Sequence, residues 1–318
     1  MRIVFFGTPL FAVPTLNALL QSGEEIPAVV TQPDKKKGRG HLLSQPPVKE
    51  LAIKEGVRIF QPASIKDADF LNELSVIRPE LIVVVAYGRI LPESILNLPP
   101  FGCINVHASL LPKYRGAAPI SWAIINGEEF TGVTTMLMDK GLDTGDILLE
   151  EKIRISDEDT TETLSEKLSG LGASLLLKTI KGIKEDSIKP RPQTGEASYA
   201  PIIKKEDGLL NWSKTAIELF NFVRGMYPWP CAYCYLGKER IKIIKVRAFD
   251  GQGKPGRIER ALKVVATRNR DGLVVGTAKG LISIIELQPE GKKVMSAGEF
   301  IRGRNIREGQ YFDEKQMD

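Results

Sequence analysis

The segment NVHASLLPKYRGAAP, residues 105–119, combines residue types that could do chemistry. Asn105 supplies an amide donor, and His107, one of only two histidines, can act as an acid, a base or a donor near neutral pH. If residues 102–107 form a β-strand, these side chains at i and i+2 point to the same face. An amide and an imidazole on one face could stabilise an oxyanion and move a proton.

A third group usually orients a catalytic histidine, and the acidic loop DKGLDTGD at residues 139–146 offers three candidates. They are Asp139, Asp143 and Asp146, and spacing alone does not choose among them. The alternative is that His107 is a hydrogen-bonded structural residue at a strand end, which is a common role for a lone histidine.

The motifs of several other enzyme classes are missing. FFGTP, residues 5–9, has one glycine where a dinucleotide fingerprint needs G-x-G-x-x-G, and there is no Walker, H-E-x-x-H or G-x-S-x-G motif. Cys231 and Cys234 form a C-x-x-C, but no second pair or nearby histidine completes a zinc site. Three cysteines also do not suggest a disulfide framework. We therefore expect no metal and a reducing, cytoplasmic location.

The elements that would position Asn105 and His107 follow an alternating pattern. Apolar runs in the first half of the chain predict strands at residues 2–6, 26–31, 80–86, 102–107 and 131–138. Helical periodicity covers residues 10–21, 46–56 and 159–184. The run ELIVVVA at 80–86 is typical of a strand buried on both faces of a parallel sheet. The pattern predicts an α/β fold with a doubly wound, mostly parallel sheet, which binds ligands at the carboxyl ends of its strands.

The second half has a different pattern. KPRPQTGEASYAP, residues 189–201, carries three prolines and no periodicity, and we interpret it as a linker. A helix at 212–226 precedes short strands with Gly-rich turns, at residues 231–236, 239–248, 256–260, 263–267, 272–276 and 281–287. Such strands predict a small β-barrel. We expect a first domain, a linker and a second domain at residues 1–189, 190–204 and 205–318.

Basic charge is concentrated in the second half and in one loop. The formal net charge is +5, but residues 201–318 hold 22 Lys and Arg against 14 Asp and Glu, while residues 1–200 hold 22 against 25. The loop at 31–43 adds four basic residues near glycines: Lys35, Lys36, Lys37 and Arg39. This distribution suggests a polyanionic partner such as nucleic acid, and a solvated basic surface is the alternative. Arg39, between two glycines, is the residue we expect to reach bases.

Several sequence motifs along the chain occur in the same order as in a known protein superfamily. NVHASLLP, YRGAAP and LDTG together resemble the folate-dependent formyltransferase superfamily, as do FFGTPLFAVPTL, TQPDKKKGRG, VVVAYGRILP and LQPEGKKVMSAGEF, over nearly the whole chain. Within this superfamily the chain is most similar to the members that formylate methionine on initiator tRNA. The resemblance implies a Rossmann-like catalytic domain followed by an OB-like β-barrel that binds tRNA.

The resemblance also assigns roles to residues. The catalytic Asn, His and Asp of the family fall on Asn105, His107 and Asp143. The implied tetrahydrofolate site consists of Ser109, Leu110, Leu111 and Pro112, with Arg89, Ile90 and Leu91 lining the pterin pocket. The residues that we expect to contact tRNA are Lys35, Lys36, Lys37, Arg39, Lys292, Lys293, Arg302 and Arg304.

The activity implied by the resemblance is formyl transfer, for translation initiation, from 10-formyltetrahydrofolate to the α-amino group of methionine on initiator methionyl-tRNA. Asn105 and His107 would stabilise the oxyanion, while Asp143 would orient His107 and assist proton transfer. No metal is implied, and the family favours a monomer. Two departures from the family pattern are Ala108 and Cys231, where glycine is frequent.

Two alternatives remain open at this point. A formyltransferase acting on an amino-sugar nucleotide would share both domains, but we would not expect it to carry the basic arm at residues 35–40. A non-catalytic RNA-binding protein could use the same fold, although Asn105, His107 and Asp143 are all intact. Binding of a reduced folate would distinguish an enzyme from such a binder.

Overall fold

The computed structural model describes residues 1–37, 42–261, 272–304 and 306–313. The chain divides into two compact units. Unit 1 comprises Met1–Pro119, Phe130–Arg154 and Leu164–Pro201, and unit 2 comprises Ile120–Glu129, Ile155–Thr163 and Ile202–Asp318. Two internal segments of the first half therefore belong to unit 2. The domain boundaries expected at residues 189 and 205 stay a proposal.

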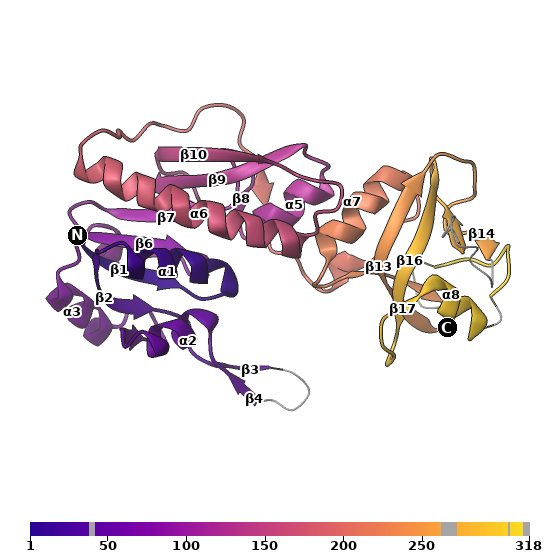
Figure 1. Ribbon diagram of the computed structural model, residues 1–318, viewed down its shortest axis with the longest axis horizontal. Coiled ribbons are helices and arrows are strands. Elements are labelled where there is room, and N and C mark those ends of the chain that lie inside the picture. The colour runs from indigo at the N-terminus through magenta and orange to yellow at the C-terminus, as the bar shows by residue number, and fades with distance from the viewer. Residues whose placement is uncertain (38–41, 262–271, 305, 314–318) are drawn as a thin grey trace. The chain divides into compact units, whose positions relative to one another are not determined.

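Unit 1 is built on a seven-stranded sheet in the order β10-β9-β7-β6-β1-β2-β5 (Figure 1). Its strands are β1 (Arg2–Gly7), β2 (Glu25–Val30), β5 (Arg58–Phe60), β6 (Leu81–Val85), β7 (Cys103–His107), β9 (Phe130–Leu137) and β10 (Ile147–Arg154). The pairs from β5 to β7 are parallel, whereas β9 and β10 pair antiparallel. The strand order reverses next to β1. The predicted doubly wound, mostly parallel α/β sheet is confirmed.

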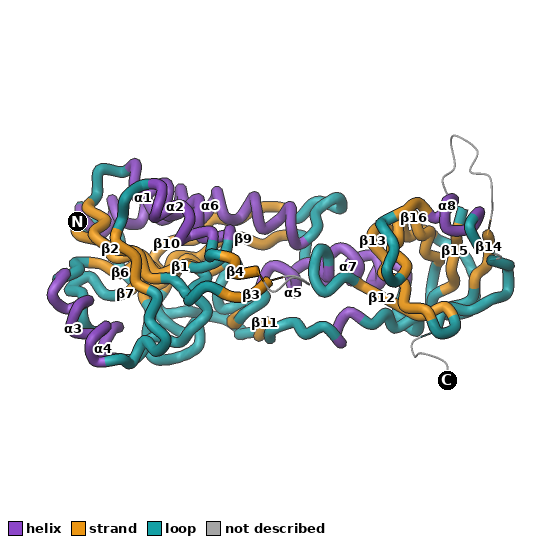
Figure 2. Tube along the Cα trace, turned by 90° about the horizontal axis from the view of Figure 1, so that it is seen from below, coloured by secondary structure: helices purple, strands orange, loops and turns teal. Residues whose placement is uncertain are grey.

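Helices cover both faces of this sheet (Figure 2). On one face lie α1 (Val13–Gln21), α2 (Pro47–Lys54) and α6 (Thr161–Lys184). On the other lie α3 (Ala68–Ile77) and α4 (Glu93–Leu96). The apolar runs of the strands supply residues to both faces. For example, Val4 and Phe6 of β1 pack in one buried cluster with Phe70 of α3 and Ile95 of α4.

The same alternation sets the direction of the side chains on β7. A Cβ added to Gly172 of α6 would lie 2.8 Å from Val106 Cγ1, so α6 packs closely on this side of the strand. Asn105 and His107, the neighbours of Val106, therefore project from the opposite face. Cys103 on that face contacts α4 through a hydrogen bond from its Sγ to Ile95 O.

Two small sheets complete unit 1. β3 (Lys35–Lys37) pairs antiparallel with β4 (Leu42–Ser44), and β8 (Arg115–Gly116) pairs parallel with β11 (Tyr199–Ala200). The β8–β11 pair binds the proline-rich segment, which the sequence suggested is a linker, to unit 1. In unit 2, α5 (Pro119–Ile125) supplies residues from Ile120 onward.

Unit 2 contains an antiparallel sheet in the order β12-β13-β16-β15-β14. Its strands are β12 (Ala232–Leu236), β13 (Glu239–Phe249), β14 (Ile258–Ala261), β15 (Leu273–Gly276), β16 (Leu281–Pro289) and β17 (Met295–Ser296), with helices α7 (Ala216–Met226) and α8 (Ala297–Arg302). Residues near the end of the chain join the two edges, because Asp313 bridges Tyr235 of β12 and Tyr311 bridges Arg257 beside β14. This joining curls the sheet into the small barrel that was predicted. The strand predicted at 263–267 lies outside the described residues.

Helix α7 begins with a capping box, and we expect this capping box to stabilise unit 2. Thr215 Oγ1 accepts a hydrogen bond from Glu218 N at 3.3 Å, and the Glu218 carboxylate accepts one from Thr215 N at 2.8 Å. We expect Thr215→Ala to lower the free energy of unfolding by about 1 kcal/mol, since the cap loses its acceptor. Thr215→Ser, which keeps the hydroxyl, serves as the control in thermal unfolding. Equal melting temperatures for the two variants would contradict the role of the cap.

Candidate active site

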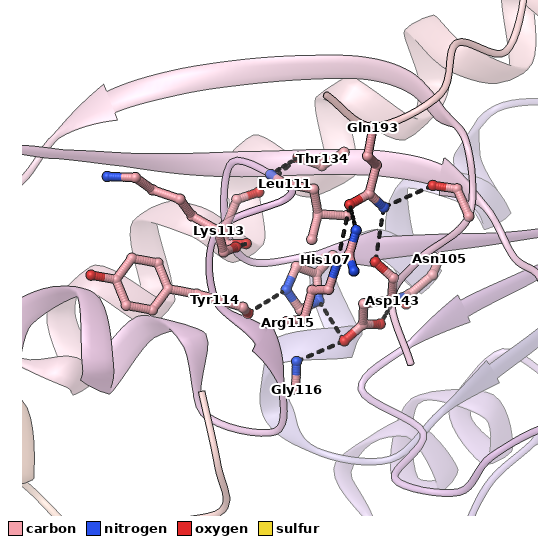
Figure 3. Close-up of polar contacts among 12 residues, drawn as sticks. Asn105, His107, Leu111, Lys113, Tyr114, Arg115, Gly116, Thr134, Asp143 and Gln193 are labelled. Atoms are coloured by element: carbon pink, nitrogen blue, oxygen red, sulfur yellow. Dashed lines mark hydrogen bonds and ion pairs between the residues drawn. The ribbon is translucent and has the colours of Figure 1, made fainter. Parts of the chain in front are cut away.

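Asn105, His107 and Asp143 lie together in unit 1 (Figure 3). Asp143 belongs to the loop between β9 and β10. Its Oδ1 accepts a hydrogen bond from Asn105 Nδ2 at 3.4 Å, and its Oδ2 lies 3.7 Å from His107 Nδ1. The side chains of His107 and Asp143 are only 6% and 13% exposed, so water screens this pair weakly. The two residues chosen from β7 therefore share one acidic partner.

The structure distinguishes the three aspartates that spacing left open. The Asp139 carboxylate accepts hydrogen bonds from Gly141 N at 2.9 Å and Thr144 Oγ1 at 2.7 Å, inside its own loop. Asp146 contributes its main-chain carbonyl to Leu137 N. Asp139 therefore stabilises the conformation of the loop, whereas Asp143 is the aspartate of the loop that faces His107.

A backbone donor also fixes the Asp143 carboxylate. Gly116 N donates to Asp143 Oδ2 at 2.8 Å. Gly116 has a φ of 122°, and a Cβ there would lie 2.7 Å from Ala200 O across the β8–β11 pair. Only glycine fits this position without displacing the backbone. The glycine of the YRG run is thus explained by the close approach of the chain beside Asp143.

The tautomer of His107 follows from its second partner. His107 Nε2 lies 3.0 Å from the carbonyl oxygen of Tyr114. Because a carbonyl oxygen can only accept, Nε2 must carry a proton. Nδ1, the other ring nitrogen, faces Asp143. Tyr114 itself has a φ of 60°, and its N–H donates to Ser198 Oγ at 2.9 Å.

The turn after β7 is held by Thr134 of β9. Thr134 Oγ1 donates to Ser109 O at 2.7 Å and accepts from Leu111 N at 3.2 Å. Ser109 Oγ donates to Lys113 O at 2.6 Å, and Ser109 is fully buried. Leu111 packs against Met136 in a small buried cluster. The Ser-Leu-Leu-Pro segment is thus a fixed turn beside His107.

The loop after β6 lies next to the site, because Val84 of β6 pairs with Asn105 of β7. Arg89 Nη1 donates to the carbonyls of Pro62 and Ala63 at 3.2 and 2.9 Å, which holds this loop to its neighbour. Leu91 is buried in the α3–α4 cluster, while Ile90 is 78% exposed. Among these three predicted pocket residues, Ile90 presents its side chain to solvent.

Burial raises the pKa of two groups near the strands. Burial raises the pKa of the Cys103 thiol to about 12, so the thiol stays protonated and is a poor nucleophile. Burial also raises the pKa of Tyr87, which follows β6. Among the described residues, no group of three or more His, Cys, Asp or Glu could hold a metal ion.

The predicted tRNA contacts that the structure describes belong to β3 of unit 1 and to unit 2. In unit 1, Lys35 of β3 is exposed and donates to Gln32 Oε1 at 2.8 Å, and Lys36 and Lys37 belong to the same strand. Arg39 lies outside the described residues. In unit 2, Lys292, Lys293 and Arg302 are exposed.

Arg304, another predicted contact, pairs with an acidic residue of unit 2. Its guanidinium forms a two-pronged ion pair with the Glu239 carboxylate and lies 5.0 Å from the centre of the Phe300 ring. Its positive charge is therefore largely matched within unit 2.

Sequence reasoning missed the contribution of the proline-rich segment. Gln193 Nε2 donates to Asp143 O and Gly145 O, both at 2.8 Å, and Ser198 supports Tyr114. Arg115 donates to Gln193 Oε1. An aperiodic segment with three prolines carries no signal for these contacts, since they depend on the pairing of β8 with β11.

The geometry around His107 predicts an observable tautomer. We expect the neutral ring to carry its proton on Nε2, because Tyr114 O can only accept. Long-range proton–nitrogen correlation NMR on histidine-labelled protein measures this at a pH where the ring is neutral. His41→Gln assigns the signals, since the chain has only two histidines. A neutral ring protonated on Nδ1 would contradict this geometry.

Comparisons with known proteins identify the family of the chain. A family profile described as Formyl transferase matches residues 1–180, and one described as Formyl transferase, C-terminal domain matches residues 202–305. The methionyl-tRNA formyltransferase of Thermodesulfovibrio yellowstonii is 56% identical, over 96% of this chain and 97% of its own length. That of Caldanaerobacter subterraneus subsp. tengcongensis is 51% identical, over 97% of this chain and 99% of its own length.

A solved structure supports the fold. HypX from Aquifex aeolicus in complex with tetrahydrofolic acid superposes with a TM-score of 0.64 at 16% identity. The match covers 98% of this chain and 50% of that chain, so this chain spans about half the length of HypX. On the full-length identity to the curated relatives and on the two matching profiles, the chain belongs to the formyl transferase family.

Proposed function

We propose that this protein transfers the formyl group of 10-formyltetrahydrofolate to the α-amino group of methionine on initiator methionyl-tRNA. The observation that carries the proposal is the identity of 51–56%, over nearly the full length of both chains, to relatives named methionyl-tRNA formyltransferase. The cluster of Asn105, His107 and Asp143 supports it, because the cluster holds the donors and the acceptor that formyl transfer needs.

The proposed roles follow from the hydrogen bonds of the site. Asn105 Nδ2 and protonated Nδ1 of His107 are donors that stabilise negative charge on the formyl oxygen. Asp143 stabilises the charged ring of His107 and helps to move the proton of the attacking amine toward N10, which would leave protonated as tetrahydrofolate when the bond from N10 to the formyl carbon breaks. Tyr114 O and Gly116 N hold His107 and Asp143 in place.

The residues present fit a reduced folate. 10-Formyltetrahydrofolate supplies the formyl group when it is bound. Ile90 offers an exposed apolar side chain on the loop after β6, and Leu142, next to Asp143, is 53% exposed. A planar pterin needs such apolar contacts together with polar groups that fix its orientation. The fixed turn from Ser109 to Pro112 would form the adjoining wall.

The proposed partners are initiator methionyl-tRNA and the folate, and we propose a cytoplasmic monomer. In the part of the chain that the structure describes, no helix is long and apolar enough to span a membrane. The tRNA contacts are assigned to Lys35, Lys36, Lys37 and Arg39 of the arm and to the basic residues of unit 2.

The reaction is tested by formyl transfer to charged initiator tRNA. We expect His107→Ala and Asn105→Ala each to lower kcat by about 10²–10³-fold, because each variant loses one oxyanion donor. Binding of tRNA, measured separately, should stay unchanged. Asn97→Ala, an exposed asparagine after α4, is the matched control. A variant that keeps most of its turnover would remove that residue from the proposed mechanism.

Other outcomes would redirect the assignment. A protein that binds a reduced folate but does not formylate tRNA would indicate another amine acceptor, with amino-sugar nucleotides the next to try. A protein that binds tRNA but no folate would be a binding protein with this fold.

If the basic residues of unit 2 contact phosphates, the affinity for tRNA should depend on salt concentration. Each phosphate contact steepens the log–log dependence of tRNA affinity on salt concentration by about 0.9 for a duplex. We expect Lys292→Ala and Lys293→Ala together to flatten the slope by about 1.8. Arg304→Ala should change it less, because Glu239 already neutralises that guanidinium. A slope unaffected by the lysine substitutions would contradict the assignment.

A further inference from the structure

The loop that carries Asp143 adopts a conformation that needs external support. Asp143 has a φ of 52°, in the left-handed region that residues with a side chain rarely occupy. Asp139 ties the loop internally through Gly141 and Thr144. Gly145 packs so closely on Leu137 O that a Cβ there would collide with it. The main-chain carbonyls of Asp143 and Gly145 still need donors from outside the loop.

Gln193 supplies both donors. Its single Nε2 donates to the carbonyls of Asp143 and Gly145, each at 2.8 Å (Figure 3). The amide therefore holds the main chain on either side of Thr144, starting at the carbonyl of the left-handed residue Asp143. Because both partners are carbonyl oxygens, the nitrogen rather than the oxygen must face them.

Arg115 holds the other end of the amide. Arg115 Nη2 and Nε donate to Gln193 Oε1 at 2.6 and 3.2 Å. Arg115 stands between Tyr114, whose carbonyl binds His107 Nε2, and Gly116, whose N–H binds Asp143 Oδ2. One short segment thus fixes the ring of His107, the carboxylate of Asp143 and, through Gln193, the backbone that carries Asp143.

We propose that Gln193, oriented by Arg115, is a positioning residue that sets the distance between Asp143 and His107 for the reaction. The inference rests on the proposed function. Gln193 acts through the main chain of Asp143 and Gly145, and the Arg115 side chain acts through Gln193. Loss of the amide leaves two carbonyls without their donor and frees a left-handed residue to relax, which moves the carboxylate from Nδ1 of His107.

The test uses two substitutions in the full-length protein. Gln193→Met has a similar length and removes both polar ends. Gln193→Glu keeps an acceptor for Arg115 but cannot donate to either carbonyl. We expect both variants to lower kcat for tRNA formylation about 10- to 100-fold while KM for tRNA stays within about twofold, since a small misplacement of a catalytic group has effects of this size. Glu196→Gln, an exposed residue in the same segment, is the matched control.

Two further readouts separate positioning from loss of structure. The imidazole nitrogen signals of His107 should shift in both Gln193 variants, because the carboxylate beside Nδ1 has moved. The effects of Arg115→Met and Gln193→Met on kcat should be strongly non-additive, since the Arg115 side chain acts through Gln193. Unchanged His107 signals together with unchanged kcat, or a lower melting temperature as the sole effect, would overturn the inference.

The wild-type protein separates this inference from the proposed function. If wild-type protein does not formylate tRNA, the proposed function fails, and the His107 signals still report whether Gln193 positions Asp143. If wild-type protein is active and Gln193→Met is equally active with unaltered His107 signals, the positioning role alone fails.

Discussion

The Asp143 carboxylate is the group through which the site is held together. It accepts hydrogen bonds from Asn105 Nδ2 and Gly116 N and faces His107 Nδ1 at 3.7 Å. These partners come from β7 and from β8, while Asp143 comes from the loop between β9 and β10. A mostly buried carboxylate with several donors is stable where it is, and its removal would leave those donors unpaired. The chemistry and the local folding of the site thus depend on one charge.

The position of that charge follows from a change of direction in the sheet. β7 is the last parallel strand, and β9 pairs with it antiparallel, with His107 opposite Thr134. The chain after β9 must therefore turn back to bring Asp143 to His107. That turn requires a left-handed residue at Asp143 and a close approach at Gly145. Such strain persists only where surrounding hydrogen bonds fix it, which is common at functional sites.

The sequence predicted the features that depend on residues close together in the chain, namely the strands and the direction of their side chains. Continuous apolar runs predicted β1, β2, β6, β7 and β9, and the i, i+2 spacing predicted that Asn105 and His107 share a face. Spacing could not choose Asp143, because the turn of the loop decides which aspartate returns to β7. The short helix α4 was missed because so short a segment shows no helical period. Gln193 was missed because its contacts depend on the pairing of β8 with β11, which are far apart in the chain. Tyr114 and Ser198, which meet beside this pair, are separated by 84 residues.

The chemistry at position 193 explains why an amide is suited to this place. The side chain must donate to the two carbonyls and accept from the guanidinium of Arg115 at the same time. Lysine could donate but not accept, and glutamate could accept but not donate. Glutamine satisfies both ends without a net charge. Glutamine at position 193 therefore adds no second charge beside the Asp143 carboxylate that faces His107.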